Sequence, residues 1–194
     1  IRIGLFISEV LIEEKRIEVE KRKDKLSLSE LKSSLRDPLM NRLDFKKAVS
    51  GEGINLIAEV KKKSPSKGIL RKDFRPIEIA LDYAVAGAAA LSVLTDEKFF
   101  GGNLSLIKEI KKEVSLPILQ KDFIIDDYQV YEAKSKEADA ILLIADILSK
   151  EQMSRFLGIA KSLGMDALCE IRSEEDLEKA LSANAEIIGI NNRN

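Results

Sequence analysis

The chain has 194 residues, of which 45% are hydrophobic and 34% charged, and its formal net charge is −1. This length allows one domain with a substantial core, and the balanced charge argues against a general nucleic-acid-binding protein. There is no histidine, and Cys169 is the single cysteine. An intrachain disulfide, histidine-based catalysis and the usual zinc sites are therefore excluded, and any proton transfer falls to Lys, Glu, Asp or Tyr.

Hydropathy gives no sign of a membrane or export signal. No apolar run approaches the roughly 18 residues that a membrane-spanning helix needs. The apolar residues near the N-terminus are soon interrupted by charged ones, so no signal peptide is predicted. We therefore expect a cytoplasmic protein without membrane or nucleic-acid partners. The first residue is not Met, which suggests a fragment.

Residues 1–53 are predicted to form a helical extension that has no core of its own. Residues 5–25 have the spacing of a charged amphipathic helix. Ser27 begins a second short helix with capping-type residues, and Asp44 is suited to cap a third. The apolar stripe expected on the first helix consists of Ile7, Val10, Leu11, Ile17 and Val19.

From residue 54 onward, short apolar runs alternate with amphipathic segments, which predicts a parallel sheet covered by helices in an α/β fold. Ser149 and Ser173 are predicted N-caps, and Gly87 and Gly164 predicted C-caps. Strands are expected at 56–60, 89–94, 117–121, 140–144, 167–171 and 187–190, and helices at 76–85, 104–113, 127–136, 150–163 and 174–182.

A doubly wound open sheet and a (β/α)8 barrel both fit this alternation. No Gly-x-Gly-x-x-Gly follows the first strand, so the dinucleotide-binding form of the open sheet has no support. Polar residues end several successive strands, and a barrel gathers its active site at that rim. We therefore favour a partial barrel over residues 54–194, in one domain with the extension. The rim residues are Lys61, Asp96, Lys121, Glu170, Asn191 and Arg193.

Strand alternation sorts these residues by face. Glu59 and Lys61 share one face of the first strand, and Lys121 shares a face with Phe123. Glu170 lies on the face opposite Cys169, which is interpreted as a packing residue. Each polar cluster alone is equally consistent with a structural ion pair or cap. Their convergence on one rim favours an active site.

These motifs resemble those of the indole-3-glycerol-phosphate synthase family of tryptophan biosynthesis. The Glu-x-Lys-x-x-Ser-Pro-Ser element at residues 59–66 is distinctive. The motifs occur in family order and at family spacings from about residue 5 to the end. The matching stretches are 57–61 with 64–66, 92–95 with 99–100, 119–123, 141–144, 169–171 and 188–193.

The resemblance implies a carboxy-lyase that works without cofactor or metal. It would close the ring of 1-(2-carboxyphenylamino)-1-deoxyribulose 5-phosphate with loss of carbon dioxide and water. Lys121 is then the expected acid and Glu170 the base, with Glu59 and Lys61 assisting and Asn191 orienting groups. Expected substrate-binding residues are Lys63, Ser64, Pro65, Phe99 (or its neighbour Phe100), Phe123 and Arg193.

The chain ends just after the sixth expected strand, whereas a complete barrel needs two more strand–helix units. We therefore expect the 194-residue chain by itself to be inactive, with its first and sixth strands as open edges. The alternatives are another phosphate-binding (β/α)8 enzyme, such as a phosphoribosylanthranilate isomerase, and a non-catalytic partial barrel that acts by association. Fusion or association with other tryptophan-pathway enzymes is a further candidate for its partners.

Overall fold

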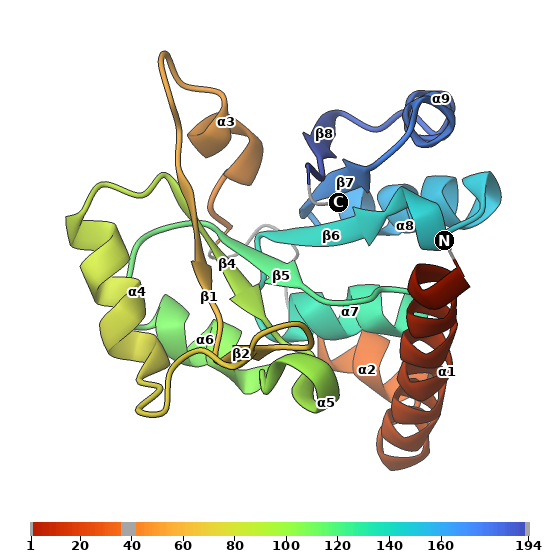
Figure 1. Cartoon of the computed structure of the whole chain (residues 1–194), viewed down its shortest axis with the longest axis horizontal. Helices are drawn as coiled ribbons and strands as arrows, with labels where there is room; N and C mark the ends of the chain where they lie inside the picture. Colours follow the sequence, from red (N-terminus) through yellow and green to blue (C-terminus); the bar gives the residue numbers. More distant parts are fainter. Residues whose placement is uncertain (1, 36–41, 193–194) are drawn as a thin grey trace.

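The sheet is the frame of the molecule. The structure, a computed structural model, describes residues 2–35 and 42–192, with residues 2–8 as backbone only. Six parallel strands form a curled half-barrel in the order β1-β4-β5-β6-β7-β8 (Figure 1). The predicted incomplete (β/α)8 barrel is confirmed. The strands are β1 (Ile57–Val60), β4 (Ala90–Leu94), β5 (Ile118–Lys121), β6 (Ala140–Ile144), β7 (Asp166–Ile171) and β8 (Ile187–Ile190).

The outer face of the sheet packs against helices and contains the main core. Val60, Leu91 and Ile141 are examples of its buried outward residues. Cys169 belongs to the same layer, as strand alternation predicts, and its burial raises the pKa of the thiol to about 12. The covering helices are α4 (Pro76–Val85), α6 (Ser105–Lys111), α7 (Asp127–Ser135), α8 (Lys150–Ser162) and α9 (Glu174–Ser182).

The inner face has a smaller apolar cluster at the amino ends of the strands. Phe45 from α3 (Phe45–Val49) packs there against Ala90, Leu119 and Ala140. All four side chains are almost completely inaccessible to solvent. This apolar cluster covers the inner face at the amino ends of the strands and leaves their carboxyl ends to polar residues.

Side-chain caps fix where the helices begin and end. Ser149 forms a capping box at α8, and Ser173 accepts the backbone N–H of Asp176 at α9, so both N-cap predictions are confirmed. Gly87 and Gly164 lie one residue beyond the C-caps of α4 and α8, with φ of 85° and 68°. The predicted C-caps are thus shifted by one residue, because glycine is needed where the backbone turns left-handed.

The N-terminal helices α1 (Arg2–Lys25) and α2 (Leu28–Ser34) lie beside α7 (Figure 1). The apolar stripe expected on α1 is wrong in part, since Val10 and Ile17 are 41% and 43% exposed. Val19 is buried as expected, and so is Lys15. The side chain of Ile7 lies outside the described ones.

The partners of α1 explain its polar inner face. Arg22 forms an ion pair with Glu132 of α7 at 2.6 Å, and Lys23 forms one with Asp126 at 2.7 Å. These contacts replace part of the apolar packing that a simple amphipathic helix would make. The face by which α1 contacts the barrel is thus partly made of charged residues, so the apolar pattern of the sequence does not reveal it.

Three short elements lie outside the expected pattern. A hairpin of β2 (Lys63–Ser64) and β3 (Gly68–Ile69) follows β1, α5 (Glu97–Phe100) follows β4, and a 3-10 turn η1 (Ala145–Ile147) follows β6. All lie in loops after strands and are too short for hydrophobic periodicity to detect. Across the described part of the chain, no helix is both long and apolar enough to cross a membrane.

Candidate active site

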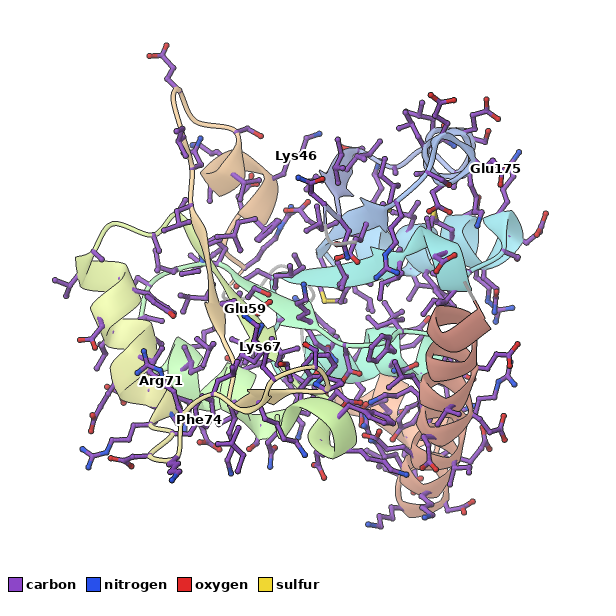
Figure 2. All side chains as sticks on the ribbon, viewed as in Figure 1. Lys46, Glu59, Lys67, Arg71, Phe74 and Glu175 are labelled. Atoms are coloured by element: carbon purple, nitrogen blue, oxygen red, sulfur yellow. The ribbon has the colours of Figure 1, made fainter. Side chains whose placement is uncertain are left out.

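A cleft of about 480 Å³ opens at the carboxyl ends of the strands. Residues from all six strands of the sheet meet there, and Glu59 lies on β1 near the middle of the molecule (Figure 2). All five residues expected to be catalytic line this cleft, although they lie far apart in the sequence. The lining comprises Glu59, Lys61, Leu94, Asp96, Phe100, Lys121, Asp122, Phe123, Leu142, Ile144, Glu170, Arg172, Ile190, Asn191 and Asn192.

Glu59 pairs with two lysines in this cleft. Lys61, two residues further on the same face of β1, donates to Glu59 Oε1, and Lys121 Nζ lies 3.5 Å from Glu59 Oε2. Burial raises the pKa of Glu59, but the hydrogen bond from Lys61 and the charge of Lys121 outweigh it, so the pKa is held below its usual value. Glu59 is therefore ionised at neutral pH.

Lys121 also approaches a second carboxylate. Its Nζ lies 3.9 Å from Glu170 Oε2, and Asn191 Nδ2 donates to Glu170 Oε1 at 2.7 Å. The parallel register explains the hydrogen bond between Asn191 and Glu170. Glu170 pairs with Gly189, and Asn191 lies two residues beyond Gly189 on the same face. One ammonium group thus lies between two carboxylates, and one of these is oriented by an amide.

One wall of the cleft is apolar. Phe100 and Phe123 have ring centroids 6.2 Å apart at an interplanar angle of 42°, and Leu94, Leu142 and Ile144 continue this wall. Aromatic side chains at this spacing are suited to contact a flat ring.

Phe99 is not among the lining residues. Its ring lies under the ammonium group of Lys98, with 5.8 Å between Nζ and the ring centroid. Adjacent side chains of a helix point in different directions, and in α5 it is Phe100 that faces the cleft. The geometry thus favours Phe100 over Phe99 as the ring contact.

The residues of the β2–β3 hairpin lie outside the cleft lining. Lys63 Nζ donates to the backbone oxygen of Lys98 at 2.8 Å, and Ser64 Oγ accepts the N–H of Lys67 at 3.3 Å. Pro65 is exposed. The substrate-binding roles expected for these residues therefore stay predictions, and Arg193 lies outside the described residues.

Some lining residues were missed by sequence reasoning. Arg172 lies two residues after Glu170, so strand alternation extended past β7 would have found it. Asp122 and Asn192 lie within the matching stretches 119–123 and 188–193, but they were assigned no role because strand alternation turns each of them away from the face of the preceding residue. Among the described residues, no group of three or more acidic or cysteine side chains could hold a metal ion.

A larger hollow, of about 570 Å³, lies at the amino ends of the strands. Lys46 of α3 (Figure 2) is one of its lining residues, and there it forms an ion pair with Glu186 at 2.5 Å. Lys161 Nζ also approaches Glu186, at 3.4 Å. In a barrel this end contributes to stability, whereas chemistry belongs to the carboxyl ends.

The fold and the cleft together define a class of protein. Acidic and basic side chains meet at the carboxyl-terminal rim of a parallel α/β half-barrel, beside an apolar wall. This is the arrangement of a (β/α)8-barrel enzyme that performs acid–base chemistry.

Sequence comparison identifies the family within that class. The family model described as indole-3-glycerol phosphate synthase matches residues 8–194, and the chain belongs to this family. It is 48% identical to the indole-3-glycerol phosphate synthase of Endomicrobium trichonymphae, over 97% of this chain and 73% of that protein. With the enzyme of the same name from Aliarcobacter butzleri it shares 47% identity over the same fractions.

Solved structures support the fold alone. A crystal structure of 3-hexulose-6-phosphate synthase aligns with a TM-score of 0.53 and 13% identity, over 72% of this chain and 66% of that one. An N-acetylmannosamine-6-phosphate 2-epimerase from Clostridium perfringens aligns with a TM-score of 0.52 and 19% sequence identity. The alignment covers 69% of this chain and 60% of that one.

Proposed function

We propose that the cleft closes the indole ring of 1-(2-carboxyphenylamino)-1-deoxyribulose 5-phosphate and releases carbon dioxide and water. The product is indole-3-glycerol phosphate, and the enzyme is a carboxy-lyase of tryptophan biosynthesis that acts on a small phosphate-containing substrate in the cytoplasm. Family membership supports this reaction. The observation that carries it is the position of Lys121 between Glu59 and Glu170.

Lys121 acts as the acid in the first step. The ring carbon that bears the carboxylate attacks the ketone carbon, and the ketone oxygen needs a proton as its charge develops. The ammonium group of Lys121 supplies it. Loss of carbon dioxide then leaves its electron pair in the ring and restores aromaticity.

Glu170 acts as the base in the second step. The new hydroxyl leaves as water after protonation, and a proton is removed from the substrate so that the indole double bond forms. Glu170 takes that proton, and the hydrogen bond from Asn191 fixes the direction of its carboxylate. Glu59 and Lys61 assist because a fixed negative and a fixed positive charge beside the reacting atoms stabilise the charges that develop there.

Charge and shape divide the substrate between two parts of the cleft. The substrate carboxylate meets the lysines, and Arg172 is a further cation in the lining. The benzene ring lies against Phe100 and Phe123, whose spacing suits a flat partner. A phosphoribosylanthranilate isomerase would need none of these pairings between Lys121 and the two glutamates.

Replacing Lys121 tests the proposal. In the protein expressed from its complete gene, Lys121→Met should lower kcat for indole-3-glycerol phosphate formation by at least about 100-fold, the usual contribution of general acid catalysis. Formation of the indole product is followed by its ultraviolet fluorescence. Lys112→Met is the matched control, because Lys112 is an exposed lysine beside α6. Normal turnover by the Lys121→Met protein would overturn the assignment.

A further inference from the structure

Lys15 of α1 is a buried cation directly behind the cleft. Its side chain is 1% exposed, and its Nζ lies 2.8 Å from each of three carboxylate oxygens, on Glu18, Asp96 and Asp122. An ammonium group has three N–H donors, so this environment satisfies all of them. Asp96 and Asp122 are buried as well and lie just after β4 and β5.

Asp96 fixes the first turn of α5. Its Oδ1 accepts the backbone N–H groups of Phe99 and Phe100 at 2.7 and 3.2 Å, while its Oδ2 faces Lys15. The carboxylate of Asp96 thus binds the backbone of Phe100, and Lys15 in turn binds that carboxylate.

Asp122 does the same for the other aromatic residue. Its Oδ1 accepts the N–H of Phe123 at 2.8 Å and also lies against Lys15. Its Oδ2 accepts the hydroxyl of Thr95 at 2.6 Å. The loops after two neighbouring strands are therefore tied together under the Phe100–Phe123 pair.

We infer that Lys15 is a positioning residue for the aromatic wall of the cleft, which gives the N-terminal helix a part in recognising the substrate ring. The inference rests on the proposed function and deepens it. One ammonium group sets the distance between Asp96 and Asp122, and each carboxylate sets the backbone of one phenylalanine. A buried ion cluster often stabilises a fold no better than apolar packing of the same volume, so its place behind this wall points to positioning.

Loss of Lys15 should affect binding of the substrate ring and leave the chemical steps unaffected. Among the described residues, no ion pair joins Lys15 to Glu59 or Glu170, the two carboxylates that face Lys121. In the protein expressed from its complete gene, Lys15→Met should raise KM for the substrate about tenfold and change kcat by less than about twofold. A tenfold change corresponds to the loss of roughly one good aromatic contact.

A binding measurement makes the test independent of turnover. The anthranilate group of the substrate is excited at wavelengths longer than those at which tyrosine and tryptophan absorb, so its fluorescence reports binding without protein background. The probe is the reduced substrate, in which the ketone is an alcohol and the ring cannot close. Its Kd should rise about tenfold in Lys15→Met, in line with KM.

A second variant covers the case in which Lys15→Met does not fold. Lys15→Met combined with Asp96→Asn and Asp122→Asn leaves no unpaired charge in the core, and it should weaken binding of the probe in the same direction. Circular dichroism and thermal unfolding establish that each variant is folded before binding is compared.

Lys111→Met is the matched control. Lys111 is 9% exposed and pairs with buried Asp139 at 2.5 Å, and Asp139 also accepts the N–H of Ile118 at the start of β5. This control removes a buried lysine at the opposite end of the same strand. It should lower stability and leave KM and the probe's Kd unchanged.

The outcomes decide between the explanations. Unchanged binding by a folded Lys15 variant, or an equal loss in Lys111→Met, would overturn the positioning role. Absence of ring closure by the unmodified protein would instead overturn the proposed function. The Kd of the reduced substrate would still show whether Lys15 contributes to binding.

Discussion

Glu59 shows how neighbouring charges decide the state of a single residue in this cleft. Partial burial alone would favour its neutral form. The hydrogen bond from Lys61 and the nearby charge of Lys121 reverse that preference and lower its pKa. The ionised carboxylate of Glu59 therefore forms ion pairs with both lysines and holds their side chains in place.

This shift predicts a pH dependence of stability. The pKa of Glu59 is lower in the folded state than its ordinary value of 4.5, so the unfolded state binds more protons between the two values. The stabilisation by Glu59 is thus complete above pH 4.5 and is lost as the pH falls through the folded-state pKa. We expect Glu59→Gln to lower the free energy of unfolding at pH 7, with a difference from wild type that shrinks in acid. Urea unfolding across this range measures it, and a difference that stays constant with pH would contradict the expectation.

At the scale of the elements, α5 depends on a close backbone approach. Gly101 ends this helix with φ of 63°, and the N–H of Gly102 donates to the backbone oxygen of Asp96 at 2.8 Å. A Cβ on residue 102 would lie 2.2 Å from the backbone oxygen of Leu94. The turn that brings Phe100 to the cleft therefore requires glycine at position 102.

Gly102→Ala should accordingly destabilise the protein by about 1–3 kcal/mol, the usual cost of forced backbone displacement. Gly158→Ala is the control, because Gly158 lies within α8 and a Cβ there would meet nothing within 4 Å. Alanine at that helical site should stabilise by about 0.5–1 kcal/mol. Urea unfolding compares the two, and equal effects of the same sign would refute the backbone argument.

At the scale of the whole molecule, the half-barrel has two open sides. In the part of the chain that the structure describes, β1 and β8 each pair with a strand on one side only. Ile190 of β8 is 79% exposed, and an edge strand with apolar side chains invites pairing with another chain. The rim is therefore well formed where β4 to β7 pair on both sides and open at its ends.

We expect the half-barrel to associate through its open strand edges as its concentration rises. Ile190→Lys should reduce the association in sedimentation velocity. Leu181→Lys should leave it unchanged, because Leu181 is 56% exposed but lies on the helix α9 and offers no strand edge for pairing. A monomer at every concentration would contradict this expectation.

Much of the fold was predictable because its signals are local. Apolar runs and their spacing located all six strands of the sheet, and Ser149 and Ser173 marked helix starts through bonds within four residues. Strand alternation also assigned Glu59, Lys121 and Glu170 each to a face of its own strand, and in the structure these faces line one cleft.

The α/β alternation, the faces of the strands and the residue types at the rim were thus predictable, because each depends on neighbours along the chain. The burial of Lys15, its ion pairs with Asp96 and Asp122, and the choice of Phe100 over Phe99 at the cleft became clear only from the folded chain. The physical reason is that a charge is stable in the core only beside its partners. Those partners, Asp96 and Asp122, lie far from Lys15 in the sequence and meet it only when the barrel has curled.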